Sequence, residues 1–182
     1  MAESAAARRP AISAERTIWR TGAPLARLTV RGKMTAIAAA LTATTIPAAV
    51  EICRARINGD WAALWLGRDE QLLLGPEQQG AALATELEVK LAGIDHAVVD
   101  IGHRQGAFEL AGALAAPLLN SGCPLDLRLA KFPVGMCTRT VLAKAEVVLW
   151  RRAPEHFHLE IWRSFGPYLA QFFTEAEKQF VD

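Results

Sequence analysis

The chain has 182 residues, of which 52% are hydrophobic and 21% are charged. This length suffices for one large domain, or for two small halves with a common core, without a metal or disulfide to stabilise it. The 20 Lys and Arg residues nearly balance the 19 Asp and Glu residues, so the net charge of +1 favours neither nucleic acid nor an anionic membrane as a partner. The apolar excess indicates either a surface buried against another subunit or simply a high alanine content.

The cysteines indicate the cellular compartment, and residues 1–24 indicate where the folded part of the chain begins. Cys53, Cys123 and Cys137 form no closely spaced pair, which indicates neither a disulfide framework nor a zinc site and favours a reducing cytoplasm. No apolar run approaches the roughly 20 residues of a membrane span. Residues 1–24 are interpreted as a flexible tail, in which Ile18 and Trp19 dock either on a partner or on the body of the protein.

From Leu25 onward, the periodicity of apolar residues predicts alternating strands and helices. Leu28 and Val30 share one face of the first strand, opposite Arg27, Thr29 and Arg31, which is the pattern of a half-buried sheet. The expected elements of residues 25–102 are strand 25–31, helix 34–43, a hairpin of strands 51–57 and 61–66, an extended segment 70–74, a helix ending at Gly93, and strand 96–101. This order is that of a split βαβ unit.

Residues 103–182 repeat the pattern. The expected elements are an extended segment 107–110, helix 114–119, extended segments 138–142, 147–150 and 157–162, and a last helix. Gly122, in a left-handed conformation, and Pro124 are expected to end the helix before them. Ser164 is the expected N-cap of the last helix, with Pro167 in its first turn. The predicted fold is therefore α+β, a domain of residues 25–182 with two consecutive split βαβ halves and antiparallel sheets.

Two histidines are the first candidate site. His156 and His158 lie two apart on a predicted strand and point to one face, so they can bind a metal if a third ligand joins them. No third ligand is evident in the sequence. The simpler interpretation places both histidines on the solvent-exposed face of a strand whose other face carries Phe157, Leu159 and Ile161.

Other candidates are equally incomplete, and we name no catalytic residue. Cys123 follows a helix C-terminus, where the dipole raises the pKa of a thiol, and Cys137 has Arg139 nearby but no base. Asp100, His103 and Arg104 lie where the halves meet, and they either line a cleft that takes a ligand or form an ion pair between the halves. A group of basic residues comprises Arg128, Lys144, Arg151 and Arg152. No aromatic residues suited to stacking bases lie among them, so we interpret the group as a solvated or partner-facing edge rather than a nucleic-acid site.

Several longer motifs follow one another in a specific order. They are residues 61–74 (WAALWLGRDEQLLL), Val98 to Ile101 with Arg104, Leu118 and Leu119 with residues 122–127 (GCPLDL), Phe132 and Pro133 with Gly135 and residues 137–140, residues 143–151 (AKAEVVLWR), and residues 162–165 (WRSF) with Tyr168 and Leu169. In this order, from about Leu25 to Phe180, the sequence resembles the γ subunit family of heterotetrameric sarcosine oxidases.

The resemblance implies a fold similar to the folate-binding region of aminomethyltransferases, and a place in a bacterial, cytoplasmic αβγδ enzyme. That enzyme oxidises sarcosine with O2 and tetrahydrofolate to glycine, hydrogen peroxide and methylenetetrahydrofolate. The resemblance further implies that FAD, FMN, NAD and tetrahydrofolate are held by other subunits, and that this chain is a structural subunit packed against the aminomethyltransferase-like region of α. The alternatives are the equivalent subunit of an N-methylglutamate dehydrogenase-type complex, or a stand-alone folate-binding one-carbon protein that uses Asp100 and Arg104.

Overall fold

The structure, a computed structural model, describes residues 18–44 and 46–180, and its strands form two antiparallel sheets. The first sheet has the order β3-β4-β5-β2-β6, with β2 at Ala26–Gly32, β3 at Ala55–Asn58, β4 at Trp61–Gly67, β5 at Glu70–Gly75 and β6 at His96–Asp100. The second has the order β1-β7-β10-β9-β8, with β1 at Ile18–Thr21, β7 at Gln105–Ala111, β8 at Cys137–Leu142, β9 at Ala145–Ala153 and β10 at His156–Trp162. The predicted α+β class with antiparallel sheets is confirmed.

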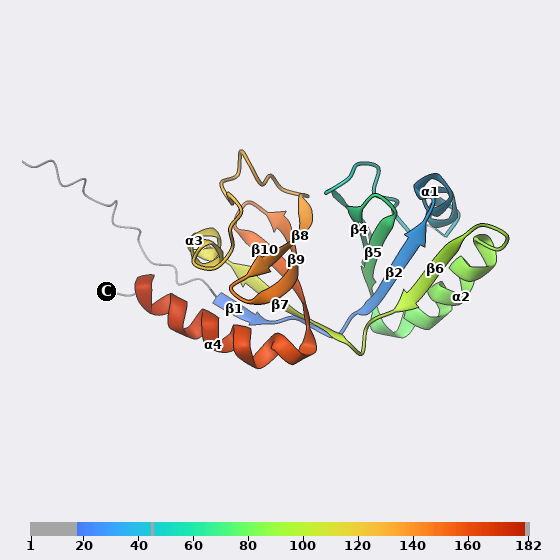
Figure 1. Cartoon of the computed structure of the whole chain (residues 1–182). Helices are drawn as coiled ribbons and strands as arrows, with labels where there is room; N and C mark the ends of the chain where they lie inside the picture. The colour runs from blue at the N-terminus through green and yellow to red at the C-terminus, as the bar shows by residue number, and fades with distance from the viewer. Residues whose placement is uncertain (1–17, 45, 181–182) are drawn as a thin grey trace, which may run out of the picture.

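The sheets lie face to face between two pairs of helices (Figure 1). Helices α1 (Met34–Thr42) and α2 (Gly80–Lys90) cover the outer side of the first sheet, and α3 (Ala115–Asn120) and α4 (Gly166–Glu177) cover that of the second (Figure 1). Short 3₁₀ turns at Glu77–Gln79, Arg163–Phe165 and Lys178–Phe180 flank α2 and α4. The central strands are therefore buried on both faces, and Ala62, Leu64, Leu72 and Leu74 of the first sheet pack with Val148 and Trp150 of the second.

The first half is a complete split βαβ unit, whereas the second half borrows a strand. Strands β4-β5-β2-β6 with α1 and α2 follow the βαββαβ order, and β3 adds an edge. In the second half the equivalent strands are β9, β10 and β7, and the fourth position, beside β7, is taken by β1 from the start of the chain. The second unit is thus completed by residues that precede the first.

Residues 18–21, which the sequence placed in a flexible tail, form an edge strand instead. Trp19 pairs with Leu110, and its ring packs against Phe108 and Phe173, with centroids 5.7 and 5.5 Å apart. Of the two predicted docking sites for Trp19, the body of the protein is the one that the structure shows. A strand of four residues between breakers carries too little periodicity to be found in the sequence.

Replacing Trp19 with alanine is expected to lower the free energy of unfolding by about 2 kcal/mol, because the half-buried ring loses its contacts with Phe108 and Phe173. Urea denaturation of the full chain measures the loss. Trp162→Ala is the control, since the Trp162 side chain is 44% exposed and should cost less than half as much. Equal losses in the two variants would contradict a role for β1 in the core.

Three local predictions were wrong, each for a physical reason. Gly122 does not have a positive φ; it is required because a Cβ there would lie 2.7 Å from the Phe172 ring and 3.0 Å from the Ala143 nitrogen. Ser164 does not cap α4, because the chain first makes a 3₁₀ turn at Arg163–Phe165 and Phe165 takes the N-cap position. Residues 51–54, expected in a strand, turn at Cys53, whose φ is 60°, before β3 begins at Ala55.

Candidate functional site

A buried network of charged side chains crosses the contact between the two sheets. Arg27 of β2 donates from Nε to Glu160 Oε2 on β10 at 2.6 Å, and only 4% and 1% of their side chains are exposed. The other oxygen of Glu160 lies 2.7 Å from His158 Nε2, and His158 Nδ1 lies 2.7 Å from Glu109 Oε1. His156 Nε2 reaches Glu109 Oε2 at 2.6 Å. The network therefore ties the first half to the second through Arg27.

The pairing of the strands explains why these side chains meet. Across the second sheet one row of paired residues runs through Arg20, Glu109, His158, Trp150 and Cys137. Paired residues on neighbouring strands place their side chains on the same face, which here is the face toward the first sheet. The row thus puts a histidine beside a carboxylate in the interior of the protein, where neither meets solvent.

The interior fixes the charges of this network. Burial by itself would lower the pKa of His158, but the hydrogen bonds and charges of Glu109 and Glu160 outweigh it and raise the pKa to about 9. Burial would likewise raise the pKa of Glu109, yet its hydrogen bonds to His158 and His156 leave that pKa below the ordinary value. His158 is therefore a cation at neutral pH, held between two carboxylates.

The hydrogen bonds of this network serve a structural role. Protonated His158 donates from both ring nitrogens and has no free lone pair, so it serves neither as a base nor as a metal ligand. Across residues 18–44 and 46–180, no three His, Cys, Asp or Glu side chains gather as a metal site would need. The predicted solvent-exposed position of His158 is wrong, because the face it occupies packs on another sheet and leaves it 2% exposed.

A second ion pair joins the halves near β5 and β8. Arg139 donates from an η nitrogen to Glu70 Oε1, and its other η nitrogen lies 3.5 Å from Glu146. Glu70 is buried to 8% exposure by this contact between the sheets. This pair adds a second charged contact between the halves to that of Arg27 with Glu160.

The residues where the halves meet in sequence make local contacts. Asp100 accepts a hydrogen bond from the Gly102 nitrogen at 2.8 Å, which shapes the turn between β6 and β7. Arg104 points elsewhere, with its guanidinium 4.8 Å from the centroid of the Trp162 ring. Asp100, His103 and Arg104 are exposed and share no ion pair in the part of the chain that the structure describes.

The cysteines are buried or half-buried thiols away from any base. Burial, with the nearby Cys53, raises the pKa of Cys137 to about 12, so its thiolate is not formed at neutral pH. Cys123 is 6% exposed within the apolar core of the second half. All three cysteines are free. The favoured interpretation of Cys123, a buried cysteine behind a helix end, agrees with its position.

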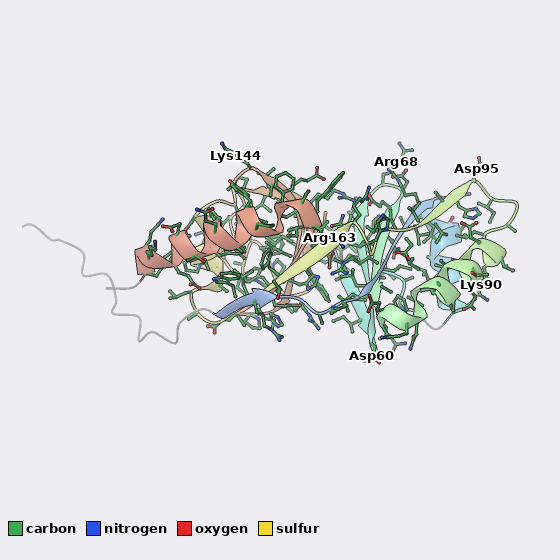
Figure 2. The ribbon with its side chains drawn as sticks, turned by 90° about the horizontal axis from the view of Figure 1, so that it is seen from below. Asp60, Arg68, Lys90, Asp95, Lys144 and Arg163 are labelled. Atoms are coloured by element: carbon green, nitrogen blue, oxygen red, sulfur yellow. The ribbon has the colours of Figure 1, made fainter. Side chains whose placement is uncertain are left out.

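The four residues of the predicted basic edge lie in different environments in the structure. Arg151 is 2% exposed and lies 4.4 Å over the Phe157 ring, donating to the Leu127 carbonyl, and burial lowers its pKa. Arg128 pairs with Asp126 beside it in the chain. Lys144 lies at the far turn between β8 and β9 (Figure 2). Arg152 pairs with Glu109 and lines a pocket.

Three residues of the network were missed by sequence reasoning, namely Arg27, Glu109 and Glu160. The signal that could have found them is the run of His156, His158 and Glu160 at a spacing of two, because three polar residues on one face of a central strand require partners from the facing strand. Arg27 was assigned to the solvent face for the same reason that His158 was. Both assignments assume that a polar face meets water.

The fold is two split βαβ units packed sheet to sheet, and their buried charged side chains pair with one another across and within the sheets. The family model described as Sarcosine oxidase, gamma subunit family matches residues 32–179. The chain therefore belongs to the sarcosine oxidase γ subunit family.

Individual relatives agree with this assignment. Sarcosine oxidase subunit gamma of Corynebacterium sp. (strain P-1) is 33% identical over 138 residues, covering 76% of this chain and 66% of the relative, so the chain spans about two thirds of that protein's length. A chain of the heterotetrameric sarcosine oxidase of Corynebacterium sp. U-96, solved in complex with pyrrole 2-carboxylate, superposes with a TM-score of 0.82 at 27% identity, over 91% of this chain and 86% of that one.

The fold extends to a further class. The glycine cleavage system aminomethyltransferase T of Bartonella henselae has a TM-score of 0.68 at 16% identity, covering 86% of this chain and 45% of that one. At this identity the likeness shows the fold alone. It confirms the fold that the sequence resemblance implied.

Proposed function

We propose that the chain is the γ subunit of a heterotetrameric sarcosine oxidase and acts there as a non-catalytic structural subunit. The enzyme as a whole converts sarcosine, O2 and tetrahydrofolate to glycine, hydrogen peroxide and methylenetetrahydrofolate. The observation that carries the proposal is the superposition on a chain of the heterotetrameric enzyme, with a TM-score of 0.82.

Partners and cofactors follow from the same proposal. The chain packs against the aminomethyltransferase-like region of the α subunit within an αβγδ complex in the bacterial cytoplasm. FAD, FMN, NAD and tetrahydrofolate belong to the other subunits. Among the residues that the structure describes, no helix is long and apolar enough to cross a membrane.

The state of the polar residues supports a structural role. His158, Glu109 and Glu160 satisfy one another, and the Cys137 thiol is held protonated by burial. Asp100 and Arg104, the candidates for a folate site, serve a turn and a ring contact respectively. Groups held in this way favour a subunit that contributes shape and contacts to a complex.

The test is co-expression of the chain with the α, β and δ chains of a sarcosine oxidase, followed by size-exclusion chromatography. The chain should co-elute with flavin absorbance, and leaving it out should reduce the yield of assembled complex. Within the complex, Asp100→Asn and Arg104→Gln should leave sarcosine-dependent peroxide formation per flavin unchanged, because neither side chain acts on substrate.

Two results would contradict the proposal. One is a chain that stays a separate monomer and never joins a flavin-containing complex. The other is a fall of about tenfold or more in turnover per flavin for Asp100→Asn in a complex assembled at normal yield, which would assign that carboxylate a catalytic role.

A further inference from the structure

A pocket of about 330 Å³ lies between the two sheets, at the end where the β3–β4 hairpin carries Asp60 (Figure 2). Its volume is within the range of small-molecule sites. Leu25, Ala62 and Leu74 form an apolar wall on the side of the first half, and the pocket continues across to Trp150 of β9.

The polar residues of the pocket come from the cross-sheet row described above. Arg20, Glu109, His158 and Trp150 are successive members of that row, and all four line the pocket. Arg152 joins them because it follows Trp150 by two residues on β9, and side chains two apart on a strand point to the same face. The site is therefore held by hydrogen-bonded strands rather than by mobile loops.

One of the residues that line this pocket carries a buried donor without an acceptor. The indole Nε1–H of Trp150 has no hydrogen-bond partner among the described residues, although Trp150 is only 3% exposed. A buried N–H without a partner destabilises the fold, and such groups are rare in folded proteins. A ligand oxygen in the pocket would remove that destabilisation.

The charges of the lining residues favour an anion. Arg20, on an exposed edge strand, has no ion-pair partner in the described part of the chain, and Arg152 reaches Glu109 only at 3.5 Å while its guanidinium lies 5.1 Å from the Trp150 ring. Of the acidic lining residues, Glu109 already hydrogen-bonds to His156 and His158, and Asp60 lies at the tip of the β3–β4 hairpin. Two arginine side chains at the mouth of a pocket are suited to a carboxylate, which a guanidinium binds through paired hydrogen bonds.

We propose that this pocket binds a small organic carboxylate with a flat apolar body, with Arg20 and Arg152 on the carboxylate, Trp150 Nε1 donating to one of its oxygens, and the body against Leu25 and Leu74. The proposal is carried by four features that lie together: Arg20 without an ion-pair partner, Arg152 with only a long contact to Glu109, one buried donor without an acceptor, and an apolar wall.

Benzoate is the probe, and its uncharged analogue benzamide is the comparison. In ¹⁵N-labelled full-length chain, benzoate should shift the Trp150 indole N–H resonance, assigned by its loss in Trp150→Phe. Calorimetry should show benzoate binding at least about tenfold more tightly than benzamide, the effect expected when a charge-assisted hydrogen bond is lost. Arg20→Gln combined with Arg152→Gln should weaken benzoate by a similar factor or more.

Arg163→Gln is the matched control, because Arg163 is exposed beyond the end of β10 and does not line the pocket. It should bind benzoate as the parent does. Trp150→Phe keeps an aromatic ring and should weaken benzoate even if the double arginine variant folds poorly. Binding that is equal for benzoate and benzamide, unaffected by Trp150→Phe, or absent up to the solubility limit would overturn the proposal. So would binding to the isolated chain that disappears in the assembled complex, since a partner side chain would then be the occupant.

Discussion

Replacing Arg27 with methionine is expected to lower the free energy of unfolding by about 3–5 kcal/mol, the usual cost of removing one partner from a buried ion pair. The Glu160 carboxylate, with 1% of its side chain exposed, would lose the guanidinium 2.6 Å away and keep only His158. The effect is large because water cannot reach Glu160 to replace the lost charge. Urea denaturation at neutral pH measures it.

The control for this prediction lies on the same strand. Arg31 also forms an ion pair, with Asp69 at 2.9 Å, but their side chains are 54% and 52% exposed. Arg31→Met should therefore cost less than about 1 kcal/mol, because exposed pairs contribute little. If the two variants lost similar stability, the Arg27–Glu160 pair would not be the contact that holds the halves together.

The free energy of unfolding is expected to depend on pH through the titration of His158. Its pKa rises from an ordinary 6.5 to about 9 on folding, so the folded state binds a proton that the unfolded state releases. The stabilisation is complete below about pH 6.5 and is lost as the pH rises through about 9, by an amount on the order of 3 kcal/mol. Neutral His158 keeps a single N–H, so either Glu109 or Glu160 loses its donor.

Other charged groups around His158 define the controls. Arg27 and Arg152 reach the two carboxylates from neighbouring strands, and His156 shares Glu109. The decline between pH 6.5 and 9 should be absent in His158→Gln and retained in His96→Gln, because His96 bonds Glu88 at the surface. A parent protein with flat stability across this range would contradict the prediction. On the acid side, the lowered pKa of Glu109 predicts a separate loss as the pH falls below 4.5.

The order of the elements could be predicted because it rests on local patterns. Leu83, Leu87 and Leu91 recur at four-residue spacing, and all three are buried in the core beneath α2. Asn58 and Gly59 between two apolar runs predicted the β3–β4 hairpin, which the structure has. In each case the residues that carry the signal are neighbours along the chain.

The buried network could not be predicted, because alternation along a strand shows which residues share a face and not what that face meets. Arg27 and His158 each sit opposite apolar residues, which favours solvent for both. They are buried only because two sheets pack together, an event that depends on distant strands. Likewise, the position of Asp100 and Arg104 beside the point where the halves join does not indicate their contacts, which are a turn hydrogen bond and a ring contact.

The borrowed strand β1 sets the order in which the protein can be completed during synthesis. Trp19 leaves the ribosome before the whole first half, while its partner Leu110 on β7 and its neighbour Phe173 on α4 follow long after. The first half can fold as soon as β6 is made, but the second sheet needs β10, and its outer face is covered only when α4 follows. Because β1 and α4 are so far apart along the chain, we expect their contact to form late in folding.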